Sequence, residues 1–283
     1  LFASSTGGLT AGRVSPDTAL FPYITVDKVH ESGLHTGPRT LLRVHSDDGE
    51  KLWEPFNSQQ DTIWHIDRHV YKNVLGNKLC FAEANHDLGL EFRYTWSTSD
   101  EFGFVRSFKL LNQGGQSRRV EILDGLQNVL PAGTPRFTQT NSSNLVDAYK
   151  WTELDGETGL AMFTLYSGIT DRAEPCESLK ANVVFCLGLA EPKVLLSSEQ
   201  LGRFRRGGAV ETELGKRGIR GAYFVNQLLE VEPGEAACWE FVANIELSQA
   251  AVVRLRHRLG NTAEVADAVD ASVRDGCDRL ARI

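Results

Sequence analysis

The sequence predicts a mainly β protein, a large antiparallel sandwich followed by C-terminal helices. Two features carry this prediction. Apolar and polar residues alternate through most of the chain, as they do in strands with one buried face. After residue 247 the alternation stops, and apolar residues recur at the three- and four-residue intervals of a helix. We therefore expect a β domain over residues 1–247 and a helical segment over residues 248–283.

The strongest strand signal lies between Leu90 and Leu130. Its first run alternates polar residues with four apolar ones, Leu90, Phe92, Tyr94 and Trp96. Turn sequences at residues 100–103 and 112–117 separate this run from two further ones. We expect three long strands, joined as hairpins, to form the centre of one large antiparallel sheet.

Shorter strands are expected on both sides of this block. Three hairpins are predicted, at Thr40–Ser46 with Lys51–Pro55, Trp64–Val74 with Lys78–Asn85, and Tyr149–Leu154 with Leu160–Ser167. Further strands are predicted at Phe21–Val26, Leu179–Leu189, Arg220–Val231 and Ala236–Leu247. The first of these contains a proline and is expected at a sheet edge. Residues 134–147 lack a clear period and predict a long loop with some helix.

The C-terminal segment predicts two helices. Ser248 is a suitable N-cap for the first and Thr262 for the second, because a side-chain oxygen can accept a hydrogen bond from a free backbone N–H. The second helix carries an apolar stripe of Val265, Val269, Val273, Cys277 and Leu280. We expect this segment to be a linker toward a further domain.

The composition narrows the class of protein. The chain has 283 residues, and its net charge of −7 argues against nucleic acid as a partner. No apolar run approaches the roughly 20 residues that cross a bilayer, so no membrane partner is expected. The five cysteines are widely spaced, which favours a reduced, cytoplasmic protein. Because the chain opens at Leu1, we expect it to be part of a longer one.

Known catalytic and cofactor motifs are missing from the sequence. It contains no phosphate-binding loop, zinc motif, nucleophile elbow or dinucleotide fingerprint. We therefore expect no cofactor and no metal, and no catalytic residue can be assigned.

The densest group of polar residues that could bind a ligand or take part in catalysis lies at residues 64–69. On a strand, His65, Asp67 and His69 share one face, so two imidazoles and one carboxylate could bind a metal or a sugar. A solvated strand face explains the same pattern, and no further ligand is visible nearby. His86 and Asp87 could act as an acid–base pair, as in sugar epimerases, or form an ordinary turn.

Three other features each have two interpretations. Asp124 interrupts the apolar face of its strand, where a buried carboxylate would need a partner and have a raised pKa, unless it lies at the rim. The basic, glycine-rich segments at residues 203–208 and 216–220 could bind phosphate or carboxylate, or form solvated loops. The tryptophans are mostly expected in the core, with Trp53 the best candidate for exposure.

Several segments resemble the N-terminal domain of cellobiose-phosphorylase-like enzymes, glycoside hydrolase family 94. They are the polar loop Thr6-Gly7-Gly8, the hairpin end Leu52-Trp53-Glu54-Pro55 and the block Leu90–Leu111. The resemblance implies a galactose-mutarotase-like antiparallel supersandwich with C-terminal linker helices that lead to an (α/α)6 barrel. Since the catalytic acid and phosphate site of this family lie chiefly in the barrel, no catalytic residue is carried over to this chain.

The function that this resemblance implies is a non-catalytic module of a glycoside phosphorylase or hydrolase that acts on β-linked oligosaccharides. The module would serve as scaffold, substrate-site wall and subunit contact, with a homodimer as a further expectation. The candidate sugar contacts are Arg13, Asp17, Trp53, Trp64, His65, Asp67 and His69.

Two alternatives remain open. A free-standing mutarotase-like aldose epimerase would need a histidine, from among His65, His69 and His86, opposite a carboxylate across a concave sheet. A pure sugar-binding or assembly module would show an exposed apolar patch on the terminal helix.

Overall fold

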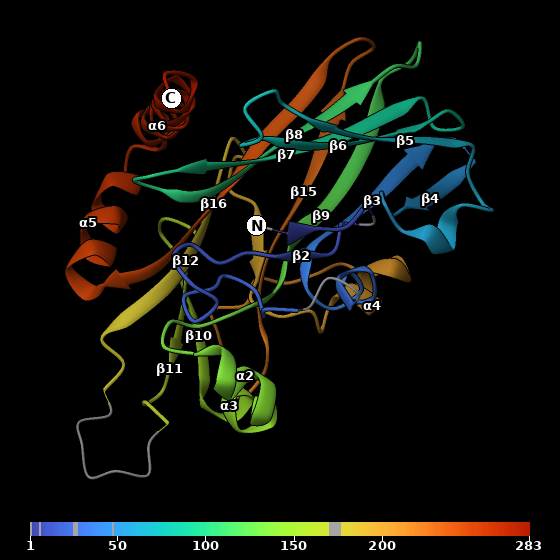
Figure 1. The fold of residues 1–283 in the computed structure, drawn as a ribbon. Helices are drawn as coiled ribbons and strands as arrows, with labels where there is room; N and C mark the ends of the chain where they lie inside the picture. Colours follow the sequence, from blue (N-terminus) through green and yellow to red (C-terminus); the bar gives the residue numbers. More distant parts are fainter. Residues whose placement is uncertain (1, 6, 25–27, 47, 170–176) are drawn as a thin grey trace.

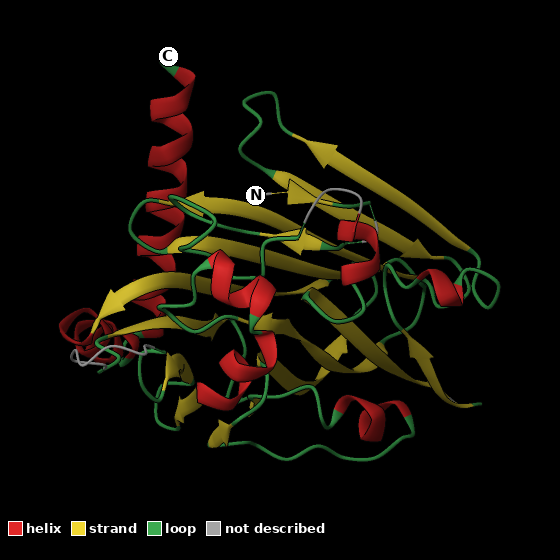
Figure 2. Ribbon diagram, turned by 60° about the horizontal axis from the view of Figure 1, so that its bottom comes forward, coloured by secondary structure: helices red, strands yellow, loops and turns green. Residues whose placement is uncertain are grey.

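The computed structural model describes residues 2–5, 7–24, 28–46, 48–169 and 177–283. Two antiparallel sheets, one of nine strands and one of five, face each other and enclose the main core (Figure 1). The long C-terminal helix runs along one side of the sheets, and its end projects past the strands (Figure 2). The predicted fold class, a mainly β antiparallel sandwich followed by C-terminal helices, is confirmed.

The nine-stranded sheet has the order β14-β10-β11-β12-β16-β8-β7-β6-β5. Its strands are β5 (Ile66–Lys72), β6 (Leu79–Asn85), β7 (Leu90–Ser99), β8 (Gly103–Asn112), β10 (Lys150–Asp155), β11 (Leu160–Leu165), β12 (Lys180–Leu187), β14 (Gly215–Arg217) and β16 (Ala236–Ser248). The predicted hairpins β5–β6 and β10–β11 are present, as is the pairing of β7 with β8. Gly103 closes the β7–β8 turn with a φ of 85°, which a residue with a side chain rarely adopts.

The five-stranded sheet has the order β13-β15-β9-β3-β4. Its strands are β3 (Gly37–Ser46), β4 (Gly49–Trp53), β9 (Arg118–Val129), β13 (Lys193–Leu195) and β15 (Gly221–Val231). The predicted hairpin β3–β4 is present. A separate two-stranded ribbon joins β1 (Phe2–Ala3) to β2 (Leu9–Thr10).

The edge strand predicted at Phe21–Val26 is wrong for residues 21–24, which form no strand. There the Thr10 hydroxyl donates to the carbonyl oxygen of Pro22 at 2.8 Å and accepts from the backbone N–H of Ile24 at 3.4 Å. A side chain thus satisfies backbone groups that a neighbouring strand would otherwise bind. Residues 25 and 26 lie outside the described residues.

The third strand of the central block is not where it was predicted. β9 follows β8 in sequence but pairs with β3 and β15 in the smaller sheet, while β16 takes the place beside β8. The chain crosses between the sheets at Asn112, whose buried side chain donates to the carbonyl oxygens of Gln116 and Val231, both at 2.8 Å. Alternation cannot reveal this crossing, because a strand in either sheet turns its apolar face toward the same core.

Large side chains fill the space between the sheets. The largest fully buried ones include Trp53, Trp239, Tyr94, Tyr223, Phe81 and Phe92. The N-terminal residues Leu9, Leu20 and Phe21 also belong to this cluster. These side chains form one packed core. The burial of each aromatic or aliphatic side chain contributes about 1.5–3 kcal/mol to the stability of the fold.

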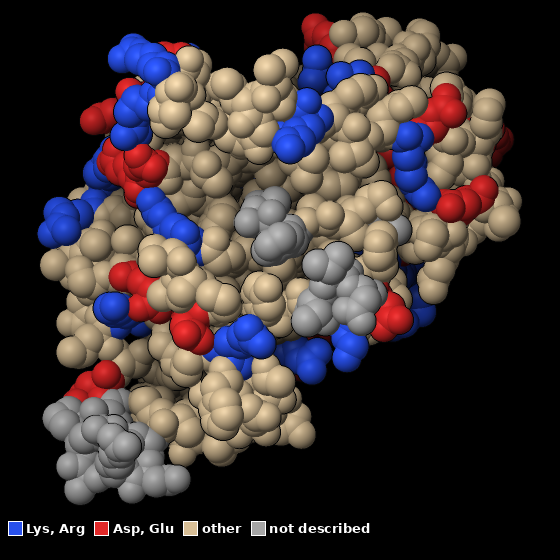
Figure 3. Space-filling model, viewed as in Figure 1, with Lys and Arg blue, Asp and Glu red and all other residues tan. Residues whose placement is uncertain are grey.

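Two helices, α5 (Gln249–Leu259) and α6 (Thr262–Ala281), cover the middle of the outer face of the nine-stranded sheet. From the predicted stripe of α6, Val265, Val269 and Val273 are buried there, whereas Leu280 is 38% exposed. Ion pairs also hold the helices against the strands and turns of the sheet. Acidic and basic side chains are interspersed along this edge of the molecule (Figure 3). The role of residues 248–283 as a linker stays a prediction.

The caps of these two helices differ in how well they were predicted. Ser248 caps α5 as expected, and its side chain accepts from the backbone N–H of Ala251. The prediction of Thr262 as the second cap is wrong, because the side chain of Asn261 accepts from the backbone N–H of Glu264 and α6 begins at Thr262.

The remaining helices are short. α4 (Leu201–Arg205) covers the outer face of the five-stranded sheet through Leu201 and Phe204. α2 (Arg136–Asn141) and α3 (Ser143–Tyr149) occupy most of the predicted loop at residues 134–147. α1 (Val29–Ser32) and a 3-10 helix (Ser58–Gln60) complete the set in the described part of the chain.

Two expectations about the environment of the chain stay predictions. Among the described residues, no helix has the length and apolar character needed to cross a bilayer. Cys80, Cys186, Cys238 and Cys277 are free thiols, and Cys176 lies outside the described residues.

Candidate functional site

The histidine cluster predicted at residues 64–69 lies on the edge strand β5 and meets the β6–β7 turn. The Nε2 of His86 is 2.8 Å from the Oδ2 of Asp67, and the rings of His65 and His86 have centroids 4.7 Å apart. The backbone N–H of His65 donates to Asp87 at 2.7 Å. The structure therefore brings the two polar motifs, which are separated in sequence, into one cluster.

This cluster is open to solvent. The side chains of His86 and Asp67 are 43% and 61% exposed. The hydrogen bond from His86 lowers the pKa of the Asp67 carboxyl, so this group stays ionised at neutral pH. Within the described ranges, no group of three or more histidine, cysteine or acidic side chains is arranged to hold a metal ion. The cluster is an exposed polar surface and not an enclosed pocket.

The interior lacks the histidine that the epimerase alternative requires. All seven histidines belong to the described residues, and none of them is buried. His65, His69 and His86 are all exposed and lie outside the space between the sheets. The pairing of His86 with Asp67 therefore occurs at a sheet edge and not across a concave groove.

Arg13 and Asp17 lie far from the histidine cluster. Arg13 donates to Asn244 Oδ1 at 2.9 Å and to the carbonyl oxygen of Ser99 at 3.3 Å, and Asp17 accepts from the backbone N–H of Arg136 at 2.7 Å. Ser99 ends β7, whereas the histidine cluster lies beside its start. Ten strand residues span roughly 30 Å, so the candidate sugar contacts do not form one site.

Trp53 is completely buried, and the expectation of its exposure is wrong. It ends β4 with its ring in the core, and its Nε1 donates to Glu83 Oε1 at 2.7 Å. Glu83 also accepts from the side chain of Arg68 and, at 2.7 Å, from the backbone N–H of Phe56. Trp64 is half-buried against the same core. Neither tryptophan therefore presents as much accessible ring surface as a fully exposed aromatic residue.

Asp124 is fully buried, as one of its two interpretations required. Its carboxylate accepts from the Thr40 hydroxyl at 2.6 Å and from Trp239 Nε1 at 2.9 Å. Arg106 Nη1 lies 3.4 Å away, and its guanidinium lies over the ring of Tyr94 at 4.1 Å. Burial raises the pKa of the Asp124 carboxyl above its ordinary value, as predicted. These partners occupy both carboxylate oxygens, so Asp124 is a structural group.

The basic, glycine-rich segments hold protein carboxylates. Arg205 donates to both carboxylate oxygens of Glu54, at 2.6 and 3.0 Å. Lys216 pairs with Glu199 and, at 3.3 Å, with Glu213. Internal partners thus use most of the charges that suggested a phosphate site, although Arg206 and Arg217 pair with no carboxylate of the described residues.

A groove that the sequence did not predict lies on the outer face of the nine-stranded sheet, between β10, β11 and α5. Its volume is about 240 Å³. The lining includes Glu153, Met162, Thr164, Leu179, Val252 and Val253. Tyr166 follows Thr164 by two residues, so its side chain leaves the same face of the sheet beside the groove. It is 70% exposed.

A stack of side chains on three neighbouring strands holds this tyrosine. The rings of Tyr166 and Trp151 are nearly parallel, with centroids 5.9 Å apart and planes inclined by 20°. The guanidinium of Arg217 lies 3.9 Å from the centroid of the Trp151 ring. Trp151 supports one face of Tyr166, and the high exposure of Tyr166 leaves the rest of its ring available. The expectation of Trp151 in the core is wrong, because it lies on the outer face.

The polar groups of the groove are only partly used. Lys180 pairs with Glu246 at 3.0 Å, and the Thr164 hydroxyl donates to the carbonyl oxygen of Trp151 at 3.2 Å. No described residue forms an ion pair or hydrogen bond with the carboxylate of Glu153. The groove therefore has apolar side chains and a carboxylate without a described partner in its lining, and a supported aromatic ring lies beyond one end of it.

Comparisons with known proteins give little further information. No family model and no curated protein matches the sequence. Among solved structures, a polysaccharide lyase has a TM-score of 0.46 and 12% sequence identity, and the match covers 88% of this chain. This chain spans 34% of the length of the lyase chain. The likeness is too weak to carry a functional argument, and the resemblance to family 94 stays a prediction.

Proposed function

We propose that this chain is a carbohydrate-binding module of a larger carbohydrate-active enzyme, and that it holds an oligosaccharide in the groove beside Tyr166. One observation carries the proposal: an exposed aromatic ring, at the end of the strand that supplies Met162 and Thr164, follows a groove lined by apolar side chains and by a carboxylate that has no partner among the described residues. Surface residues usually provide only one of these features.

The chemistry of a pyranose matches this arrangement. One face of the sugar ring consists of C–H groups, which pack against an aromatic ring. Its hydroxyl groups donate to carboxylates, and Glu153 has both oxygens available among the described residues. The apolar side chains of Met162 and Val252 can exclude water beneath the sugar.

The finer parts of the proposal come from the family resemblance. The parent enzyme would be a glycoside phosphorylase or hydrolase that acts on β-linked oligosaccharides. Its catalytic domain would be an (α/α)6 barrel following this chain, and the module would serve as scaffold and subunit contact, with a homodimer as the assembly. The predicted contacts around His65, Asp67 and His69 would belong to a separate, weaker surface.

A second candidate function is assembly with another protein. It is favoured by the exposure of Leu179 and Val253 at the groove, which are 62% and 53% exposed. Exposed apolar patches commonly mark protein interfaces. In that case the groove would bind a second copy of the chain, and Val253→Lys would dissociate a dimer detected by light scattering.

Titration of the chain with cellohexaose, measured by isothermal titration calorimetry, tests the proposal. We expect Tyr166→Ala to weaken binding roughly five- to tenfold, because an aromatic contact contributes about 1 kcal/mol. Glu153→Gln should weaken it to a similar extent.

Tyr71→Ala provides the matched control, since Tyr71 is 51% exposed on the opposite end of the same sheet. This variant should bind like the unaltered chain. Equal losses in the two tyrosine variants, or no binding of any β-linked oligosaccharide, would refute the proposal.

A further inference from the structure

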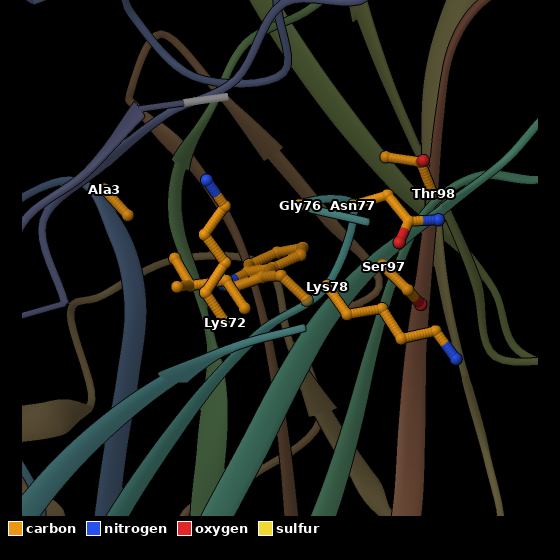
Figure 4. A pocket seen from close by; sticks show the side chains of 9 residues that line it. Ala3, Lys72, Gly76, Asn77, Lys78, Ser97 and Thr98 are labelled. Atoms are coloured by element: carbon orange, nitrogen blue, oxygen red, sulfur yellow. The ribbon is translucent and has the colours of Figure 1, made fainter. Parts of the chain in front are cut away.

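A second pocket lies at the opposite end of the nine-stranded sheet, far from the groove. It is formed by the β5–β6 turn, the end of β7 and residue Ala3 of β1 (Figure 4). Its volume is about 380 Å³, which is within the range of pockets that hold small molecules. Its lining includes Lys72, Asn77, Lys78, Trp96, Ser97 and Thr98.

The charge of this pocket is positive. Two lysines contribute to its lining, and no aspartate or glutamate is found among the described residues of the lining. Neither Lys72 nor Lys78 forms an ion pair with a described residue. Their ammonium groups point in different directions, so they flank the pocket and do not meet at one point (Figure 4). In a chain with a net charge of −7, this is a local concentration of unpaired cations.

The β5–β6 turn fixes the position of Lys72. Gly76 has a φ of 74°, and a Cβ atom at this position would lie 3.1 Å from the Cε of Lys72. Glycine therefore allows both the turn and the close passage of the lysine side chain. The side chain of Asn77 holds the turn from the other side, since it donates to Cys277 Sγ of α6 at 3.2 Å and accepts from Asn73 at 2.6 Å.

The remaining lining groups suit a sugar ring. Thr98 shares the face of β7 with Trp96 and brings a hydroxyl group that can both donate and accept, whereas Ser97 points to the opposite face. Trp96 is only 3% exposed, and the guanidinium of Arg106 lies 5.9 Å from its ring centroid. This tryptophan is thus a rigid apolar wall of the pocket.

We infer that this pocket binds a monosaccharide that carries an anionic group, either a sugar phosphate or a uronate. One lysine neutralises the anion, while the second lysine and the hydroxyl of Thr98 bind ring hydroxyls. A neutral sugar would leave both ammonium groups unpaired, and a free anion would leave the Thr98 hydroxyl and the tryptophan wall unused.

The test compares four probes on the unaltered chain by NMR titration: glucose, glucose 6-phosphate, glucuronate and inorganic phosphate. At least one of the two anionic sugars should bind at least tenfold more tightly than both glucose and inorganic phosphate. The anionic sugar that binds more tightly shows whether the anionic group of the natural ligand is a phosphate or a carboxylate. Equal affinity for glucose, or equal affinity for inorganic phosphate, would overturn the inference.

Variants then locate the site. Lys72→Gln and Lys78→Gln should each weaken binding of the preferred anionic sugar about three- to tenfold. Lys109→Gln, which changes an exposed lysine on the same sheet, should leave it unchanged. Tyr166→Ala should also leave it unchanged, so a failure at this pocket can be distinguished from a failure at the groove. Unchanged affinity in both pocket variants would contradict the assignment.

Discussion

The two faces of the nine-stranded sheet use charged residues in opposite ways. On the inner face, Arg106 and Glu83 are both 1% exposed, and they pair with protein groups: Arg106 lies beside Asp124 of β9 in the facing sheet, and Glu83 accepts from Trp53. On the outer face, α5 and α6 cover only the middle, and Glu153 at one end has no described partner. A charged side chain in a strand therefore indicates a ligand site only where the fold leaves it without an internal partner.

The largest effect is expected on the inner face. Asp124→Ala would leave the buried guanidinium of Arg106 without its carboxylate, and the free energy of unfolding should fall by about 3–5 kcal/mol. Urea unfolding measures this change. The double variant Arg106→Met with Asp124→Ala should recover part of the loss, because it removes the unpaired charge. A loss below about 1 kcal/mol in the single variant would show that the inner pair is not essential.

A smaller effect is expected at Glu83, a second of the buried carboxylates. Trp53→Phe removes the indole donor to Glu83, which should cost about 1–3 kcal/mol of stability because an acceptor loses a partner in the core. Affinity for cellohexaose should not change, since the ring is buried. If Trp53→Phe lowered the affinity for cellohexaose as strongly as Tyr166→Ala while the protein stayed folded, the distinction between the structural core and the ligand-binding outer face would be wrong.

On the covered part of the outer face, a pH-dependent effect is expected. Glu240 of β16 accepts from Ser107 at 2.6 Å beneath α6. Burial raises the pKa of this carboxyl above its ordinary value of 4.5, and the charge of Asp270 on α6 adds to the shift. A carboxyl with a raised pKa in the folded state binds its proton more tightly there, so its contribution to stability falls as the pH rises from 4.5 through the folded pKa.

Glu240→Gln removes this ionisation. The variant should be more stable than the unaltered chain at pH 7, by less than about 1 kcal/mol, and the difference should disappear below pH 4.5. Urea unfolding between pH 4 and pH 8 measures both values. A difference that does not depend on pH would mean that Glu240 is ionised equally easily in the folded and unfolded chain.

The smallest effect is expected at the exposed pair of Asp67 and His86. A double-mutant cycle with Asp67→Asn and His86→Ala should show no measurable coupling in unfolding experiments, because solvent screens both groups. By NMR, the pKa of the Asp67 carboxyl should rise toward its ordinary value in His86→Ala. Strong coupling would show that this edge is organised for a function of its own.

The sequence predicts the elements of the fold better than their arrangement. Strand alternation and turn glycines locate most strands, and the interruption of an apolar face singled out Asp124, for which the structure selects the buried position with a raised pKa over the rim position. The placement of β9 could not be predicted, since its alternation is the same in either sheet. Trp53 was misplaced because a tryptophan at the end of a hairpin strand fits a rim or a core equally well.

The groove was missed for a different reason. Its lining residues Glu153, Leu179 and Val253 are far apart in sequence and meet only through sheet pairing and the packing of α5. The neighbouring Lys150 and Thr152 point inward despite their polarity, and Lys150 is paired with Asp147. This inverted pattern places Trp151 on the outer face. By contrast, the dense histidine motif was visible in the sequence but forms an open surface.

The most direct test of the central claim is a map of backbone amide shifts during titration with cellohexaose. We predict that the shifted residues cluster on β10, β11 and α5 around Glu153, Thr164 and Tyr166, and that the signals of the inner-face residues around Arg106 do not shift. Shifts centred on the histidine cluster or on the core, or an unchanged spectrum at saturating ligand, would contradict it.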